Sequence, residues 1–83
     1  MPKIKFKEFD QRIQENQYDK LLIKGVHEHF YLYLIQGEKT YIYCGDNDQY
    51  NIYRHAEQIL AWLKSKYGIS KIEVDIEACS RHG

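Results

Sequence analysis

Residues 28–44, EHFYLYLIQGEKTYIYC, contain the two strands on which the fold depends. Two runs of β-favouring side chains, 30–35 and 40–44, flank the sequence QGEK, and this pattern predicts a β-hairpin. Side chains alternate along a strand, so a slip of one residue in the pairing moves a whole strand to the opposite face. The register of this hairpin therefore decides which residues share a surface.

Sorting by chemistry favours a loop with an odd number of residues, 36–38. This loop pairs Leu34 with Thr40 and Leu32 with Ile42, which gathers the aliphatic side chains on one face. An even loop would mix tyrosines with leucines. The odd loop predicts that the other face carries four tyrosines, Tyr31, Tyr33, Tyr41 and Tyr43. Since each ring has about 150 to 250 Å² of surface to bury, we expect something to cover that face.

The rest of the chain extends the hairpin into a single α+β domain over residues 1–83. An apolar run adds a third strand, which gives an antiparallel meander of strands at about 20–25, 28–35 and 39–44. Apolar residues at helical spacing, followed by Gly68, predict a long helix at about 52–67 on the aliphatic face. Alternating patterns predict outer strands at about 3–8 and 70–77, and the tail 78–83 is expected to fray.

The N-terminal segment has two interpretations. In the first, it is the strand at 3–8 followed by a short helix at about 10–17 that Asp10 caps. A strand there would let the lysines at 3, 5 and 7 lie beside the acidic row of the last strand. In the second, Phe6, Phe9 and Ile13 form the stripe of a helix that begins near Lys5.

Charge and cysteine usage limit the possible partners. Twelve basic and twelve acidic residues give a net charge of zero, so no overall field draws the chain to phosphate or anionic lipid. The sequence has neither a signal peptide nor an apolar run long enough to span a membrane. We therefore expect a soluble, cytoplasmic protein in which Cys44 and Cys79 stay reduced.

Motifs for catalysis or metal binding are weak. The serines lack the context of a nucleophile elbow, no glycine-rich phosphate loop is present, and Cys44 has no basic neighbour to activate it. His27 and His29 lack a matching ligand pair, and the acidic residues from Asp46 to Glu57 fit a calcium loop poorly. We predict no enzymatic activity, no metal and no cofactor.

Three interpretations of the tyrosine face remain. The N-terminal segment could cover it, another protein or a second copy of the chain could bind it, or single-stranded nucleic acid could stack on it beside lysines. Trp62 is either packed in the core or an anchor at the rim of an interface. We expect a small non-enzymatic regulatory or inhibitory module that binds protein, with nucleic-acid binding as the alternative. The expected partner-binding residues are Tyr31, Tyr33, Tyr41, Tyr43, His29, Lys39, Lys24, Trp62, His55 and Lys66.

Overall fold

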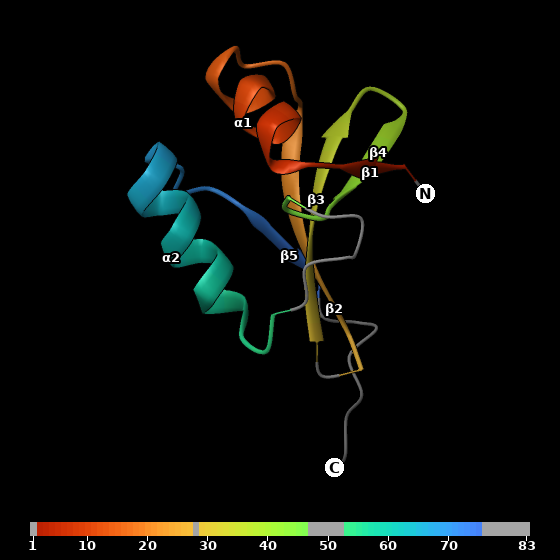
Figure 1. Ribbon diagram of the computed structural model, residues 1–83. Coiled ribbons are helices and arrows are strands. Elements are labelled where there is room, and N and C mark those ends of the chain that lie inside the picture. Colours follow the sequence, from red (N-terminus) through yellow and green to blue (C-terminus); the bar gives the residue numbers. More distant parts are fainter. Residues whose placement is uncertain (1, 28, 47–52, 76–83) are drawn as a thin grey trace.

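A five-stranded mixed sheet with both helices on the same side makes up the fold (Figure 1). The computed structural model describes residues 2–27, 29–46 and 53–75. The elements in chain order are β1 (Lys3–Ile4), α1 (Phe6–Gln14), β2 (Lys20–Val26), β3 (His29–Gln36), β4 (Lys39–Tyr43), α2 (Ala56–Tyr67) and β5 (Glu73–Asp75). The predicted α+β class, with an antiparallel meander, a short N-terminal helix and a longer second helix, is confirmed. No helix in the described ranges is long and apolar enough to cross a membrane.

The two short outer strands lie on opposite edges of the sheet. The strand order is β1-β4-β3-β2-β5, with β1 parallel to β4 and β5 parallel to β2. The predicted pairing of N-terminal lysines with the acidic row of the last strand is therefore wrong. Instead, Lys20 of β2 forms an ion pair with Glu73 of β5, with 3.0 Å between Nζ and Oε2.

The N-terminal segment follows the second interpretation, a helix that starts near Lys5. The predicted strand at 3–8 is only Lys3–Ile4, and α1 begins at Phe6. Helical spacing points Phe9 into the core, where its side chain is fully buried. Asp10 is not a cap, because it lies inside α1 and accepts a hydrogen bond from the hydroxyl of Tyr67 at 2.7 Å.

The second helix is shorter than predicted at its start. It begins at Ala56 rather than at residue 52, because Tyr53 is held in an isolated bridge to Phe30 of β3. Gly68 ends the helix as predicted, with a φ of +72° and its N–H donating to the carbonyl of Lys64. The predicted last strand at 70–77 is reduced to Glu73–Asp75 within the described residues. Residues 76–77 and the tail 78–83 lie outside them.

The register of the β3–β4 hairpin differs from the predicted one. The turn has two residues, since Gln36 pairs with Lys39, Leu34 with Tyr41, and Tyr33 with Ile42. Gly37 has a φ of +61°, as the first central position of a type II′ turn requires, and its N–H donates to the carboxylate of Asp19. This even loop turns β4 over. Tyr41 and Tyr43 share the face of Leu32 and Leu34, and the single face of four tyrosines is wrong.

Both helices cover one face of the sheet, which was predicted for the long helix alone, because the N-terminal segment was a candidate cover for the opposite, tyrosine face. The core cluster joins strand residues to Phe9 of α1 and to Ile59 and Leu63 of α2; its other members are Ile4, Leu21, Ile23, Leu32, Leu34 and Tyr43. The opposite face carries Tyr31 and Tyr33 beside aliphatic residues, and Tyr33 is only 9% exposed there. Val74 is the one large apolar side chain of the described residues that is clearly exposed. Neither face therefore carries the four tyrosines that the sequence predicted to lie together.

Candidate functional site

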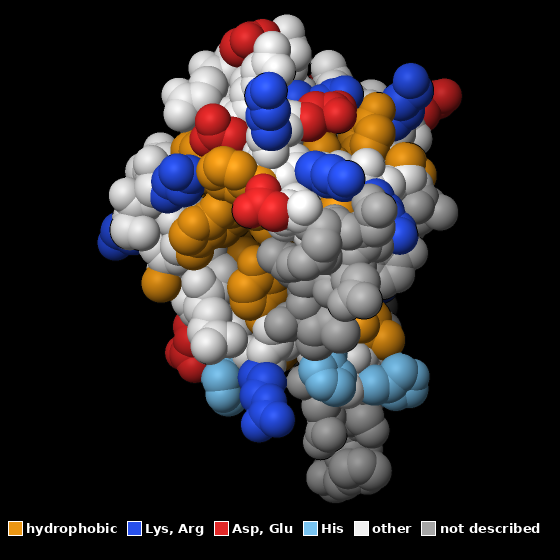
Figure 2. Space-filling view, viewed as in Figure 1, with side chains coloured by type: hydrophobic (Ala, Val, Ile, Leu, Met, Phe, Trp, Pro, Cys, Tyr) orange, Lys and Arg blue, Asp and Glu red, His pale blue; other side chains and the backbone are white. Residues whose placement is uncertain are grey.

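A pocket lined mainly by aromatic side chains opens between the start of α1, the end of β4 and α2. Its volume is about 410 Å³, and the described residues that line it are Phe6, Tyr43, Asp46, Tyr53 and Trp62. In Figure 2, hydrophobic side chains gather on the surface between α1 and α2, and both acidic and basic side chains lie at their edges. We call this site the aromatic pocket.

Backbone hydrogen bonds fix the rim of the aromatic pocket. The N–H of Phe6 donates to the carbonyl of Gly45 at 2.6 Å, and the N–H of Cys44 donates to the carbonyl of Ile4 at 3.0 Å. These bonds hold the first residue of α1 beside the turn that carries Asp46. Across the pocket, Tyr53 and Phe30 exchange two backbone hydrogen bonds of 2.8 and 3.1 Å. The walls are therefore positioned by the sheet.

The floor of the pocket is part of the hydrophobic core. The rings of Tyr43 and Trp62 are stacked, with 5.6 Å between centroids and 29° between planes. Phe9 lies behind both, 4.8 Å from Tyr43 and 5.9 Å from Trp62. Such contacts leave these rings little freedom to turn, so the floor of the pocket is preformed. Trp62 is thus packed on the core, and it also lines the pocket.

The described lining residues of the pocket carry one negative charge, and Lys66 of α2 places one positive charge beside them. Burial raises the pKa of Tyr43 well above its usual range, and nearby Tyr53 and Asp46 raise it further, so the phenol is neutral at physiological pH. Among the described lining residues, the carboxylate of Asp46 is then the single formal charge.

A lysine from α2 already uses this aromatic surface. The ammonium of Lys66 lies 5.2 Å from the ring centroid of Phe6 and 5.6 Å from that of Tyr67. Both distances are within the range of a cation–π interaction. Lys66 follows Trp62 by one helical turn, so it stands beside the pocket.

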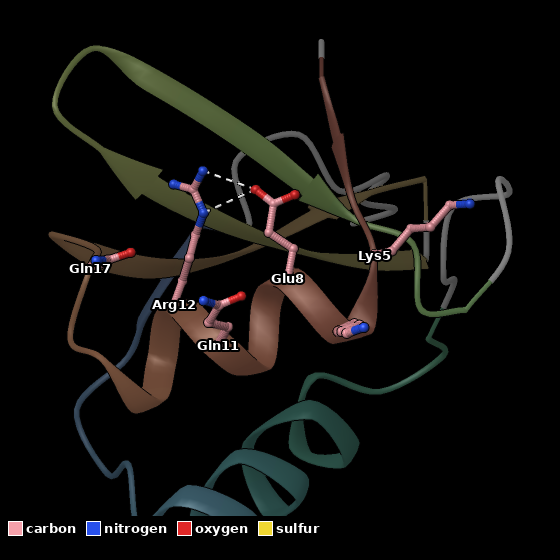
Figure 3. A pocket seen from close by; sticks show the side chains of 6 residues that line it. Lys5, Glu8, Gln11, Arg12 and Gln17 are labelled. Carbon is pink, nitrogen blue, oxygen red and sulfur yellow. Dashed lines mark hydrogen bonds and ion pairs between the residues drawn. The ribbon is translucent and has the colours of Figure 1, made fainter.

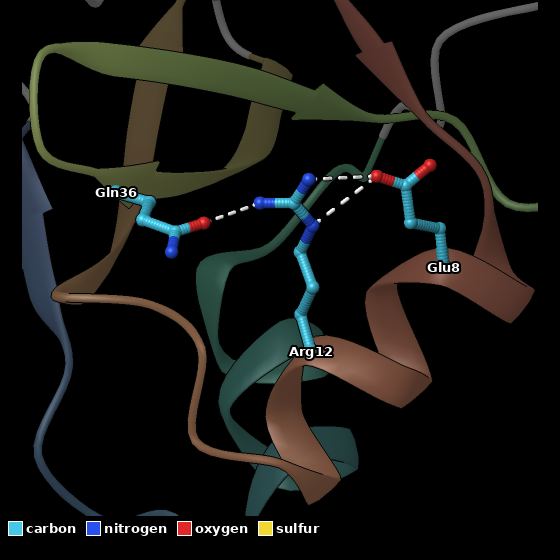
Figure 4. A network of polar contacts seen from close by, with 3 residues as sticks. All are labelled: Glu8, Arg12 and Gln36. Atoms are coloured by element: carbon cyan, nitrogen blue, oxygen red, sulfur yellow. Dashed lines mark hydrogen bonds and ion pairs between the residues drawn. The ribbon is translucent and has the colours of Figure 1, made fainter.

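A second, polar groove runs along α1 but is not a built site. It is lined by residues of α1 and of the segments that flank it (Figure 3), namely Lys5, Lys7, Glu8, Gln11, Arg12 and Gln17. The guanidinium of Arg12 donates hydrogen bonds to the carboxylate of Glu8 at 2.9 Å and to the amide oxygen of Gln36 (Figure 4). The same guanidinium lies over the ring of Tyr41, 4.7 Å from the ring centroid. Arg12 thus attaches α1 to the hairpin, and Glu8 balances its charge.

The structure brings together only some of the predicted site residues. Tyr43 and Trp62 line the aromatic pocket and Lys66 stands beside it. Tyr31 and Tyr33 lie on the opposite face of the sheet, with Lys24 paired to Tyr31, while Tyr41 lies under Arg12. The remaining predicted residues, His29, Lys39 and His55, are exposed and do not line the pocket.

Sequence reasoning missed three of the lining residues, Phe6, Asp46 and Tyr53. The helical stripe through Phe6 and Phe9 was the available signal for the first of them, because it predicts that Phe6 lies near the core. Asp46 and Tyr53 reach the pocket through contacts that local sequence does not encode. For the predicted histidine pair, Nδ1 of His29 lies 3.1 Å from the carbonyl oxygen of His27. The described residues contain no cluster of side chains that could hold a metal ion.

Comparisons of the chain with protein families, with curated proteins and with solved structures found no match.

Proposed function

We propose that this protein is a non-enzymatic binding module that recognises another protein by receiving one of its side chains in the aromatic pocket. The observation that carries the proposal is a preformed concave site with four aromatic walls that three different elements and a β-bridge hold in place. Partner residues that dominate the energy of an interface typically enter such well-packed apolar pockets. Aromatic side chains are also enriched at interfaces.

The chemistry of the lining residues favours binding over catalysis. General acid–base catalysis needs a group whose pKa lies near the working pH. The described lining residues offer one carboxylate, phenols and an indole, but no histidine, cysteine or serine. Burial moves the pKa of Tyr43 away from neutrality.

Nucleic acid suits this pocket less well than a protein does. Bases stack on aromatic rings, but their phosphates need basic side chains nearby. The pocket presents the carboxylate of Asp46 at its rim, and the whole chain has a net charge of zero. A phosphate backbone passing the pocket would be repelled by Asp46.

A peptide library tests the proposal without knowledge of the partner. Random peptides displayed on phage are selected on the wild-type protein, and the selected peptides are then measured against Phe6→Ala and Tyr31→Ser. Phe6→Ala removes one pocket wall, whereas Tyr31→Ser shortens a tyrosine on the opposite face and is the matched control. We expect Phe6→Ala to weaken binding at least about tenfold and Tyr31→Ser to leave it unchanged.

Circular dichroism of each variant shows whether it is folded before its binding is compared. The proposal fails if selection yields no binding peptide. It also fails if selected peptides bind Phe6→Ala as well as the wild type, or if Tyr31→Ser abolishes their binding, because the binding surface would then lie elsewhere.

A further inference from the structure

The aromatic pocket contains groups that attract a positive charge. A cation is attracted to the faces of tryptophan, tyrosine and phenylalanine rings, and this attraction grows when the cation loses its water. The pocket supplies all three ring types together with the carboxylate of Asp46. None of its described lining residues is basic.

Lys66 shows that this aromatic surface accepts a cation within the protein itself. Its ammonium lies over the ring of Phe6, which is also a wall of the pocket. The flexible side chain of Lys66 keeps its charged group at the exposed surface of α2. The interior of the pocket is then available to a second cation, which Asp46 would balance.

From this charge complementarity, and resting on the proposed function, we infer that the partner protein inserts a cationic side chain into the aromatic pocket. The occupant that fits best is a methylated ammonium, which is a weakly hydrated cation. An unmodified lysine ammonium is strongly hydrated, so it loses more on leaving water for an apolar site. A methylated ammonium keeps the charge and adds apolar surface that the rings can cover.

Two short peptides that differ only in charge test the inference. The first is an acetylated pentapeptide with trimethyl-lysine at its centre, and the second replaces the quaternary nitrogen with carbon. A third peptide with glutamate at the centre is the negative control. Trp62 is the only tryptophan of the chain and lines the pocket, so its fluorescence reports entry directly. We expect the uncharged analogue to bind about tenfold more weakly than trimethyl-lysine, and the glutamate peptide not to bind.

Charge variants of the protein provide the second arm. Asp46→Asn should weaken binding of the trimethyl-lysine peptide about fivefold and leave binding of the uncharged analogue unchanged. Lys66→Gln should strengthen binding of the trimethyl-lysine peptide about twofold. Glu38→Gln removes an exposed carboxylate in the turn at the other end of β4, so it is the matched control and should change neither.

The two proposals fail in different ways. Equal affinity for the charged and uncharged peptides, with no effect of Asp46→Asn, would show that the anchor is apolar and would overturn only the cation inference. A second result would also overturn only the cation inference: the selected library peptides lose affinity for Phe6→Ala, but the trimethyl-lysine peptide does not change the fluorescence of Trp62. If neither kind of peptide binds the pocket, the binding function itself is wrong.

Discussion

Tyr67 is the residue that joins the two helices through both a polar and an aromatic contact. Its hydroxyl donates to Oδ1 of Asp10 at 2.7 Å, and its ring lies edge-on to Phe9 and Trp62 at 6.2 and 5.8 Å between centroids. A hydrogen bond to a charged acceptor contributes more than a neutral one, about 1.5 to 3 kcal/mol before solvent exposure reduces it. Tyr67 therefore supports the cluster behind the aromatic pocket.

Tyr67→Phe tests this bond and its pH dependence. Burial, then the hydrogen bond and charge of Asp10, raise the pKa of Tyr67 above its ordinary value of about 10. Because the pKa is higher in the folded state, the protonated phenol contributes its full stabilisation of the fold below about pH 10. This contribution is lost as the pH rises from there toward the pKa of Tyr67 in the folded state. We expect Tyr67→Phe to cost about 1 kcal/mol at neutral pH, and this difference from wild type to shrink above about pH 10.

Urea denaturation of both proteins between about pH 8 and pH 11 gives the two stability profiles. Asp10→Asn is the matched variant, because it keeps an acceptor oxygen but removes the charge. The free energy of unfolding of Asp10→Asn should fall less than that of wild type as the pH rises. A gap between wild type and Tyr67→Phe that stays constant across this range would contradict the assignment.

The β3–β4 hairpin is the element whose turn decides which tyrosines are buried. Alternation fits either parity of the loop, so the pattern of the two strands alone does not fix the register. The assumption that tyrosines segregate from leucines failed, because α1 supplies Phe9 to cover Tyr43 and Arg12 to cover Tyr41. A phenol whose ring is covered in this way packs beside leucine without penalty.

Gly37→Ala tests whether the two-residue turn maintains this register. A β-carbon at position 37 would meet no atom within 4 Å, so alanine would not clash there. The expected loss of stability comes instead from the φ of +61°, which costs an L-residue about 1 to 2 kcal/mol. Glu38→Ala changes the neighbouring turn residue, whose φ is not positive, and should cost much less. Thermal and urea unfolding measure both variants. Equal stability of Gly37→Ala and wild type would mean that the turn does not require glycine.

At the scale of the whole molecule, the sequence predicts the meander and α2 well because their signals are local. The apolar stripe of α2 and its glycine stop are complete within one segment, as are the three runs of strand residues. Phe6, Asp46 and Tyr53 meet for other reasons. Parallel pairing of β1 with β4 and the bridge between Phe30 and Tyr53 join segments that are distant in the chain. No local pattern specifies such contacts. Tyr43, Trp62 and Lys66 of the candidate site were predicted, and the helical stripe indicated that Phe6 lies near the core, but Asp46 and Tyr53 could not be predicted.

The oligomeric state follows from how the two faces of the sheet are covered. Self-association through four tyrosines required them on one bare face, but Tyr43 is 5% exposed under the helices. On the opposite face, Tyr33 and Ile42 are 9% and 5% exposed. A stable interface buries about 800 Å² per partner, and Val74 is the one large apolar side chain of the described residues that is clearly exposed.

We therefore expect a monomer in size-exclusion chromatography with light scattering, at low and at high salt, with the mass of one chain. Tyr31→Ser should elute unchanged, because losing one partly buried phenol removes no interface. A dimer mass that Tyr31→Ser converts to a monomer would show instead that the face opposite the helices joins two copies. In that case the sheet, rather than the aromatic pocket, would be the main interaction surface of this protein.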